Sequence, residues 1–164
     1  MKYALAAAGL ALASTAWADV DPADWTSVLQ QADGQTVYWN AWGGSTTTND
    51  FIAWVGSRVQ DDHGVTLEHV KLSDTATAVT RVNAERQAGQ DAGRAIDHIW
   101  INGANFSAIK EADLLFGSFL ATPPNREIVD VAGKTVTTEF TMPTAGEESP
   151  WAMAQVGLYH ASAA

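Results

Sequence analysis

The stretch TVYWNAWGG, residues 36–44, decides the fold of this chain. Its first seven residues are rich in β-branched and aromatic side chains, which predicts a buried strand. Successive side chains of a strand point to opposite faces, and the core is the simplest place for Trp39. Trp42 ends the strand, and Gly43 and Gly44 let the backbone turn tightly there. We therefore expect a core strand that delivers Trp42 and two glycines to its end.

Helix and strand patterns alternate around this strand. They predict a helix at 24–34, a helix at 49–62, a strand at 65–72 near a sheet edge, a helix capped by Asp74, a strand at 96–101, and a short helix through Phe106 and Ile109. Strands that alternate with helices are typical of right-handed βαβ units, so we expect an α/β fold with a parallel-rich sheet flanked by helices. Further along, residues 134–143 look extended, and residues 149–159 look like another strand.

The first 18 residues have the pattern of a secretory signal peptide. A positive start precedes an apolar run that is too short to span a bilayer, and AWA at 16–18 puts small residues before the expected cleavage point. We expect cleavage after Ala18; an N-terminal membrane anchor is the alternative. The remaining residues, 19–164, are expected to form one domain, which is long enough to bury a core.

The charge of the remaining 146 residues is strongly acidic. Loss of Lys2 with the leader leaves a net charge of −11. Such a surface is a poor partner for nucleic acid or anionic lipid, and a cationic or neutral ligand fits it better. The same acidity also keeps a secreted protein soluble, so its role in ligand choice stays open. The sequence has no cysteine, so the core alone must hold the domain together.

No motif for enzyme chemistry stands out. None of the four histidines has metal-ligand spacing to another, and the nucleophile-elbow, dinucleotide-binding and P-loop motifs are absent. The adjacent acidic pairs at 61–62 and 147–148 are interpreted as solvated rather than catalytic. We therefore expect a protein that is not an enzyme and that uses no metal or cofactor.

Two predicted strand ends share an unusual composition. The first strand ends in WGGS at 42–45, and the strand at 96–101 ends in NGAN at 102–105. Ligands bind beyond the carboxyl ends of strands in open α/β sheets, where glycine allows close approach and asparagine brings both a donor and an acceptor. Trp42 and Trp151 each lie beside a turn-forming residue. For both, ligand contact through the aromatic face and plain packing stay open.

Five segments resemble the amino-terminal half of a bacterial periplasmic solute-binding protein of an ABC importer: GQTVYWNAWGG, FIAWVG, GVTLEHVKLSDTATAVTRV, IDHIWINGANFSAIKEADLLFG and ESPWAMAQ. The group looks related to the thiamine-, polyamine- and iron-binding proteins. The resemblance implies a type II periplasmic-binding-protein fold, in which two lobes close over a small molecule. The segments that match cleft-lining loops contain Trp42, Gly43, Gly44, Ser45, Ser73, Asp74, Asn102, Gly103, Asn105, Ser149 and Trp151.

The resemblance also implies partners and a location. The protein would be periplasmic and would deliver its solute to an ABC permease in the inner membrane. The acidic charge and the tryptophans favour a cationic ligand such as thiamine or a polyamine. Sugars also stack on tryptophan, so a sugar ligand stays open. No nucleic-acid partner is expected.

The sequence departs from this family at two positions and in length. Asp113 stands where a helix end commonly has glycine, and Ala152 stands where glycine is expected after the tryptophan. Members of the family are more than twice as long, because the chain crosses to a second lobe and returns. We therefore expect residues 19–164 to be a truncated first lobe with the second lobe absent. Such a fragment is expected to be marginally stable and to bind ligand weakly.

Other functions stay open. The chain could be a small secreted domain that works through protein contacts, or a truncated product without function. A secreted hydrolase that uses acidic residues is a further alternative, but no carboxylate stands out as its catalytic group.

Overall fold

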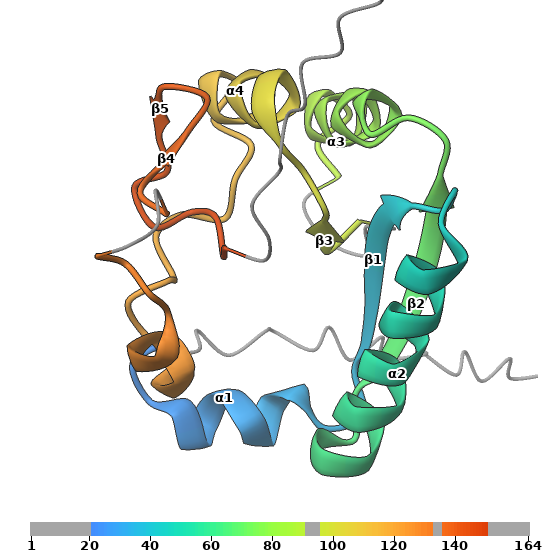
Figure 1. The fold of residues 1–164 in the computed structure, drawn as a ribbon, viewed down its shortest axis with the longest axis vertical. Helices are drawn as coiled ribbons and strands as arrows, with labels where there is room; N and C mark the ends of the chain where they lie inside the picture. Colours follow the sequence, from blue (N-terminus) through green and yellow to red (C-terminus); the bar gives the residue numbers. More distant parts are fainter. Residues whose placement is uncertain (1–20, 91–95, 133–135, 151–164) are drawn as a thin grey trace, which may run out of the picture.

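A computed structural model describes residues 21–90, 96–132 and 136–150 of the chain (Figure 1). Within these ranges the fold is mixed α/β, with a three-stranded parallel sheet flanked by helices. The described residues do not include the expected signal peptide at 1–18, Trp151, Ala152 or most of the strand expected at 149–159.

The described elements follow one another in the order that the sequence predicts over its first hundred residues. They are α1 (Trp25–Ala32), β1 (Thr36–Trp42), α2 (Thr46–His63), β2 (Thr66–Leu72), α3 (Ala76–Gln87), β3 (His98–Ile99), α4 (Gly103–Glu111), the 3₁₀ helix η1 (Pro124–Ile128), β4 (Thr138–Glu139) and β5 (Met142–Pro143).

β1 is the middle strand of the larger sheet, whose order is β2-β1-β3. All seven residues of β1 pair in parallel with β2, from Thr36 opposite Thr66 to Trp42 opposite Leu72. β3 pairs in parallel with the other edge of β1. The predicted parallel sheet is therefore confirmed, and β2 lies at a sheet edge as expected.

The first face of the sheet is covered by α2. Trp39, Ala41 and Ile52 form its buried centre, with Leu67 and Trp100 packed around them. The Trp39 ring stacks on Trp100 at 6.3 Å between ring centroids. Trp39 therefore belongs to the core, as the alternation within the strand predicts.

On the other side of the sheet, α3 and α4 lie beside each other (Figure 1). Ala78 and Val82 of α3, Ile109 of α4 and Ile96 form one buried cluster there. Ala78 and Val82 are four residues apart, so they lie on the same side of α3. Leu72 of β2 and Ile99 of β3 pack against this cluster, so α3 and α4 flank the sheet on the side away from α2.

The predicted limits of α2 need one correction. The helix begins at Thr46 and not at residue 49, because the Ser45 hydroxyl accepts a hydrogen bond from the Thr48 amide and caps the first turn. Gly64 ends the helix in the left-handed conformation, with φ of 69°, as predicted.

The predicted strand at 96–101 is wrong in length, because only His98 and Ile99 form β3. Before β3, a side chain takes the place of a backbone acceptor: Asp97 Oδ2 accepts a hydrogen bond from the Tyr38 amide of β1 at 2.8 Å. The chain stays beside β1 on both sides of β3, since the Trp100 amide donates to the Asn40 carbonyl oxygen.

Residues 134–143 were predicted to be extended, but the chain turns at residues 140–141. β4 and β5 form a tight antiparallel hairpin, and Phe140 and Thr141 at its tip have φ of 45° and 72°. Both are residues that rarely take a left-handed backbone, so the pattern of side chains did not indicate a turn. The hairpin lies beside α4 (Figure 1).

Among the described residues, no helix is long and apolar enough to cross a membrane.

Candidate ligand-binding site at the strand ends

Three of the predicted ligand loops meet at one edge of the sheet. The loop at 42–45 follows β1 and the pair at 73–74 follows β2, and the Gly43 amide donates to the Leu72 carbonyl oxygen at 2.9 Å. The loop at 102–105 follows β3, which is also parallel to β1. Parallel strands place their carboxyl ends together, so these loops share the edge where α/β sheets bind ligands.

Trp42 is the exposed aromatic group of this edge. Its residue surface is 53 % exposed, although it ends a strand whose centre is buried. Its ring lies across Gly44, because a Cβ on Gly44 would overlap Trp42 Cζ2. A Cβ on Gly43 would lie 2.7 Å from Lys71 Cβ. Both glycines are therefore required by neighbouring side chains of the protein itself.

The hydroxyl and carboxylate groups of the first two loops hold helix ends. Ser45 caps α2, as described above. Asp74 Oδ1 accepts a hydrogen bond from the Ala76 amide at 2.9 Å, at the first turn of α3. The N-cap residue of α3 is Thr75 and not the predicted Asp74. Asp74 precedes the N-cap, and its side chain still accepts the hydrogen bond from the first turn. Ser73 is exposed beside it.

The third loop is contacted by the β4–β5 hairpin. Gly103 opens α4 with φ of 53°, and its amide donates to Glu139 Oε1 at 2.6 Å. The Phe140 ring lies 3.3–3.5 Å from the position that a Cβ on Gly103 would take. Asn102 and Asn105 flank this contact, with the Asn105 amide donating to the Asn102 carbonyl oxygen. One backbone donor of the loop is thus already bonded to a carboxylate of the protein.

The acidic pair at 147–148 is partly buried, which corrects its interpretation as a solvated loop. Glu147 forms an ion pair with Lys110, and only about a fifth of each side chain is exposed. Burial and the nearby Glu139 carboxylate raise the pKa of Glu148 to about 7. Ser149 directly follows Glu148, so this predicted ligand residue lies in the segment beside α4.

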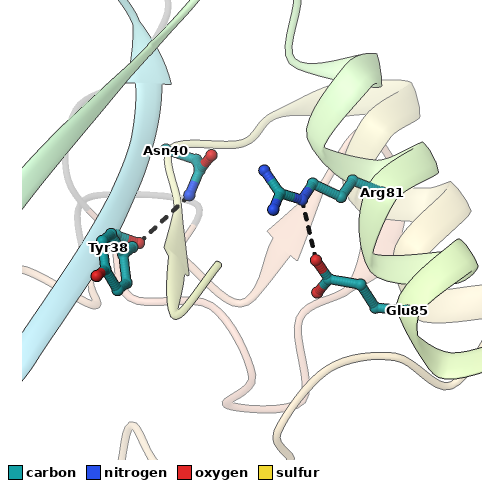
Figure 2. Close-up of polar contacts among 4 residues, drawn as sticks. All are labelled: Tyr38, Asn40, Arg81 and Glu85. Atoms are coloured by element: carbon teal, nitrogen blue, oxygen red, sulfur yellow. Dashed lines mark hydrogen bonds and ion pairs between the residues drawn. The ribbon is translucent and has the colours of Figure 1, made fainter. Parts of the chain in front are cut away.

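A polar group on the α3 side of the sheet was missed by sequence reasoning (Figure 2). Asn40 is 2 % exposed in the middle of β1, and its Nδ2 donates to the Tyr38 carbonyl oxygen at 3.3 Å. Arg81 and Glu85 of α3 extend towards it and form an ion pair of 2.9 Å. The available signals were an asparagine inside an apolar strand and an Arg–Glu spacing of four residues.

His98 lies next to the core tryptophan Trp39. The His98 ring packs edge-on against Trp39 at 5.2 Å between centroids, and burial lowers the pKa of its imidazole. Within the described ranges, no three histidine or acidic side chains are grouped so that they could hold a metal ion. The geometry here suits binding through an aromatic face, backbone groups and carboxylates.

Fold and site together define an α/β domain with a candidate ligand site at the carboxyl ends of its parallel strands. No family model matches the chain, and no solved structure matches it. The chain is similar to protein YnjB of Escherichia coli (strain K12), at 41 % identity over 133 residues. These residues are 81 % of this chain and 34 % of that protein, so the chain spans about a third of the length of that relative.

Proposed function

We propose that this chain is the ligand-binding first lobe of a periplasmic solute-binding protein with the type II fold. In this proposal it captures a small solute at the strand ends and delivers it to an ABC permease in the inner membrane. The observation that carries the proposal is the meeting of three loops, at 42–45, 73–74 and 102–105, beyond the carboxyl ends of parallel strands. The half-exposed Trp42 at the same edge supplies an aromatic face.

The charges near this edge favour a cation as the solute. Asp74 follows β2, Glu139 is bonded to Gly103 in the loop that follows β3, and Glu148 lies near Glu139. A cation placed among them would be attracted by their carboxylates and could also stack on the Trp42 indole. A ligand anion would meet carboxylates and would compete with Glu139 for the Gly103 amide.

A role in protein contacts is the second candidate. Phe116 is 90 % exposed and Ile128 is 85 % exposed in the described structure, and both lie after α4 and away from the strand-end loops in sequence. Exposed large apolar side chains are found at surfaces that contact other proteins. An oligomer or a captured protein that buries Phe116 and Ile128 would favour this second function.

A fluorescence titration with thiamine and with spermidine tests the binding function. We expect a saturable change of tryptophan fluorescence with at least one of these cations. Trp42→Ala is expected to weaken the binding about two- to thirtyfold, the range of one cation–π contact. Trp54→Ala is the matched control, because Trp54 is 59 % exposed but lies two turns into α2. Equal losses in both variants, or no response to either cation, would contradict the proposed site.

A further inference from the structure

A groove lies on the α2 side of the sheet, between α2 and the edge strand β2. It has a volume of about 470 Å³, within the range of roughly 300–1,000 Å³ that small-molecule sites occupy. One wall is formed by α2, from Asn49 to Ser57, and the other by Leu67, His69 and Lys71 of the edge strand β2. Two of these side chains touch Gly43 of the strand-end loop at 42–45: Lys71 packs against it, and Asn49 donates to its carbonyl oxygen.

The groove is kept open by a glycine that packing does not demand. A Cβ on Gly56 would lie 3.7 Å from Leu67 Cβ, which is an ordinary van der Waals distance. Alanine would therefore fit at position 56, and glycine is the less favourable residue inside a helix. Together with Ala53, Gly56 leaves an apolar hollow above Ile52 and Leu67.

The rim of the groove carries one charge of each sign. Asp50 lies on the helix wall and Lys71 on the strand wall, and both are exposed. In the part of the chain that the structure describes, neither side chain takes part in an ion pair. The two walls therefore offer an acidic and a basic group that the protein leaves available to a partner.

Two polar atoms in the same walls are also unused. Asn49 Oδ1 and His69 Nε2 are buried and have no hydrogen-bond partner within the described ranges. Asn49 donates through Nδ2 to the Gly43 carbonyl oxygen, so its amide is oriented by the protein while its oxygen stays unsatisfied. Buried polar atoms without a partner are uncommon in folded proteins, which makes two in one groove a sign of an incomplete site.

We propose that this groove is a second binding site, for a small zwitterion with a short apolar body, such as a branched-chain amino acid. The ammonium group would face Asp50, the carboxylate would face Lys71, and the apolar body would fill the hollow over Gly56. This site is separate from the strand-end site, so it stands or fails independently of the proposed transport function.

Amide chemical shifts of the purified chain test this site with three matched probes. L-Leucine carries both charges, isopentylamine lacks the carboxylate, and 4-methylpentanoate lacks the ammonium group. We expect leucine to shift the amides of residues 49–57 and 67–71 in a saturable way. Each single-charge analogue is expected to bind about three- to fivefold more weakly, the effect of one exposed ion pair.

Variants of the groove distinguish the contribution of its two charges from that of its apolar hollow. Asp50→Asn and Lys71→Gln are each expected to weaken leucine binding about three- to fivefold, whereas Asp61→Asn on the same helix is expected to leave it unchanged. Gly56→Leu is expected to abolish the shifts by filling the hollow. Absence of groove shifts up to about 10 mM leucine would overturn the proposal. Equal affinity for all three probes, or insensitivity to Asp50→Asn and Lys71→Gln, would also overturn it.

Discussion

Gly44 shows how a single residue fixes the candidate site. The Trp42 indole lies across Gly44, and a side chain at that position would overlap the ring. We predict that Gly44→Ala displaces the Trp42 ring and lowers the free energy of unfolding by at most about 1 kcal/mol, because both residues are exposed and the ring can move aside. The measurement is urea denaturation together with the indole N–H resonance of Trp42.

Gly56→Ala is the control for this prediction. Its added Cβ meets Leu67 at an ordinary distance, so stability is expected to stay the same or to rise. An unmoved Trp42 resonance in Gly44→Ala would show that the ring does not depend on this glycine.

Glu148 couples stability to pH. Its pKa is raised from 4.5 to about 7, first by burial and then by Glu139. Between these values the folded chain binds more protons than the unfolded chain, so the free energy of unfolding falls as pH rises. The stability that this group contributes is complete below about pH 4.5 and is lost above about pH 7. His98 acts in the opposite direction below pH 6.5, because burial lowers its pKa.

Glu148→Gln isolates the effect of this carboxyl group. We predict that wild type loses stability relative to Glu148→Gln when the pH rises from about 5 to about 8. Urea denaturation of both proteins at several pH values measures this difference, and Glu111→Gln on the exposed surface is the control. A difference that does not change with pH would contradict the raised pKa of Glu148.

At the scale of elements, α4 is held at both ends by the segment that contains the hairpin. Glu139 accepts from the Gly103 amide at the start of the helix, and Glu147 pairs with Lys110 in its last turn. A carboxylate at a helix N-terminus is stabilised by the free amides and by the helix dipole. The hairpin therefore positions the loop that carries Asn102 and Gly103.

We predict that Glu139→Ala lowers the free energy of unfolding by about 1–2 kcal/mol and speeds hydrogen exchange at the Gly103 amide. Both proteins are compared at about pH 5, where Glu148 is protonated. At this pH, removing the Glu139 carboxylate relieves little charge repulsion with Glu148, so the loss of the bond to Gly103 dominates the result. Glu111→Ala at the other end of α4 is expected to have no effect or a small stabilising one. An unchanged exchange rate at Gly103 would contradict the role of Glu139.

Local sequence patterns predicted the elements well where side-chain periodicity was strong. β1 was predicted over the same seven residues that form it, because its β-branched and aromatic residues end at glycines on both sides. β3 was predicted too long, since Asp97 replaces a backbone partner with its side chain. The hairpin turn at Phe140 and Thr141 was missed because neither residue type favours a left-handed backbone.

At the scale of the whole molecule, the sequence predicted the strand-end loops but not what lies beside them. The parallel order of β1, β2 and β3 follows from strand–helix alternation, and it brings the three loops to one edge. The contact between Glu139 and Gly103 spans 36 residues. The Arg81–Glu85 pair faces Asn40 because of the way α3 lies beside the sheet (Figure 2). Such contacts depend on tertiary packing, which local spacing does not encode.

Hydrogen exchange of the chain with and without a bound solute tests the central claim most directly. The solute is thiamine or spermidine, whichever changes the tryptophan fluorescence. The account predicts that its binding protects amides in all three loops, at 42–45, 73–74 and 102–105, because they form one site at the end of the sheet. Protection confined to a single loop, or found only away from the strand ends, would contradict it.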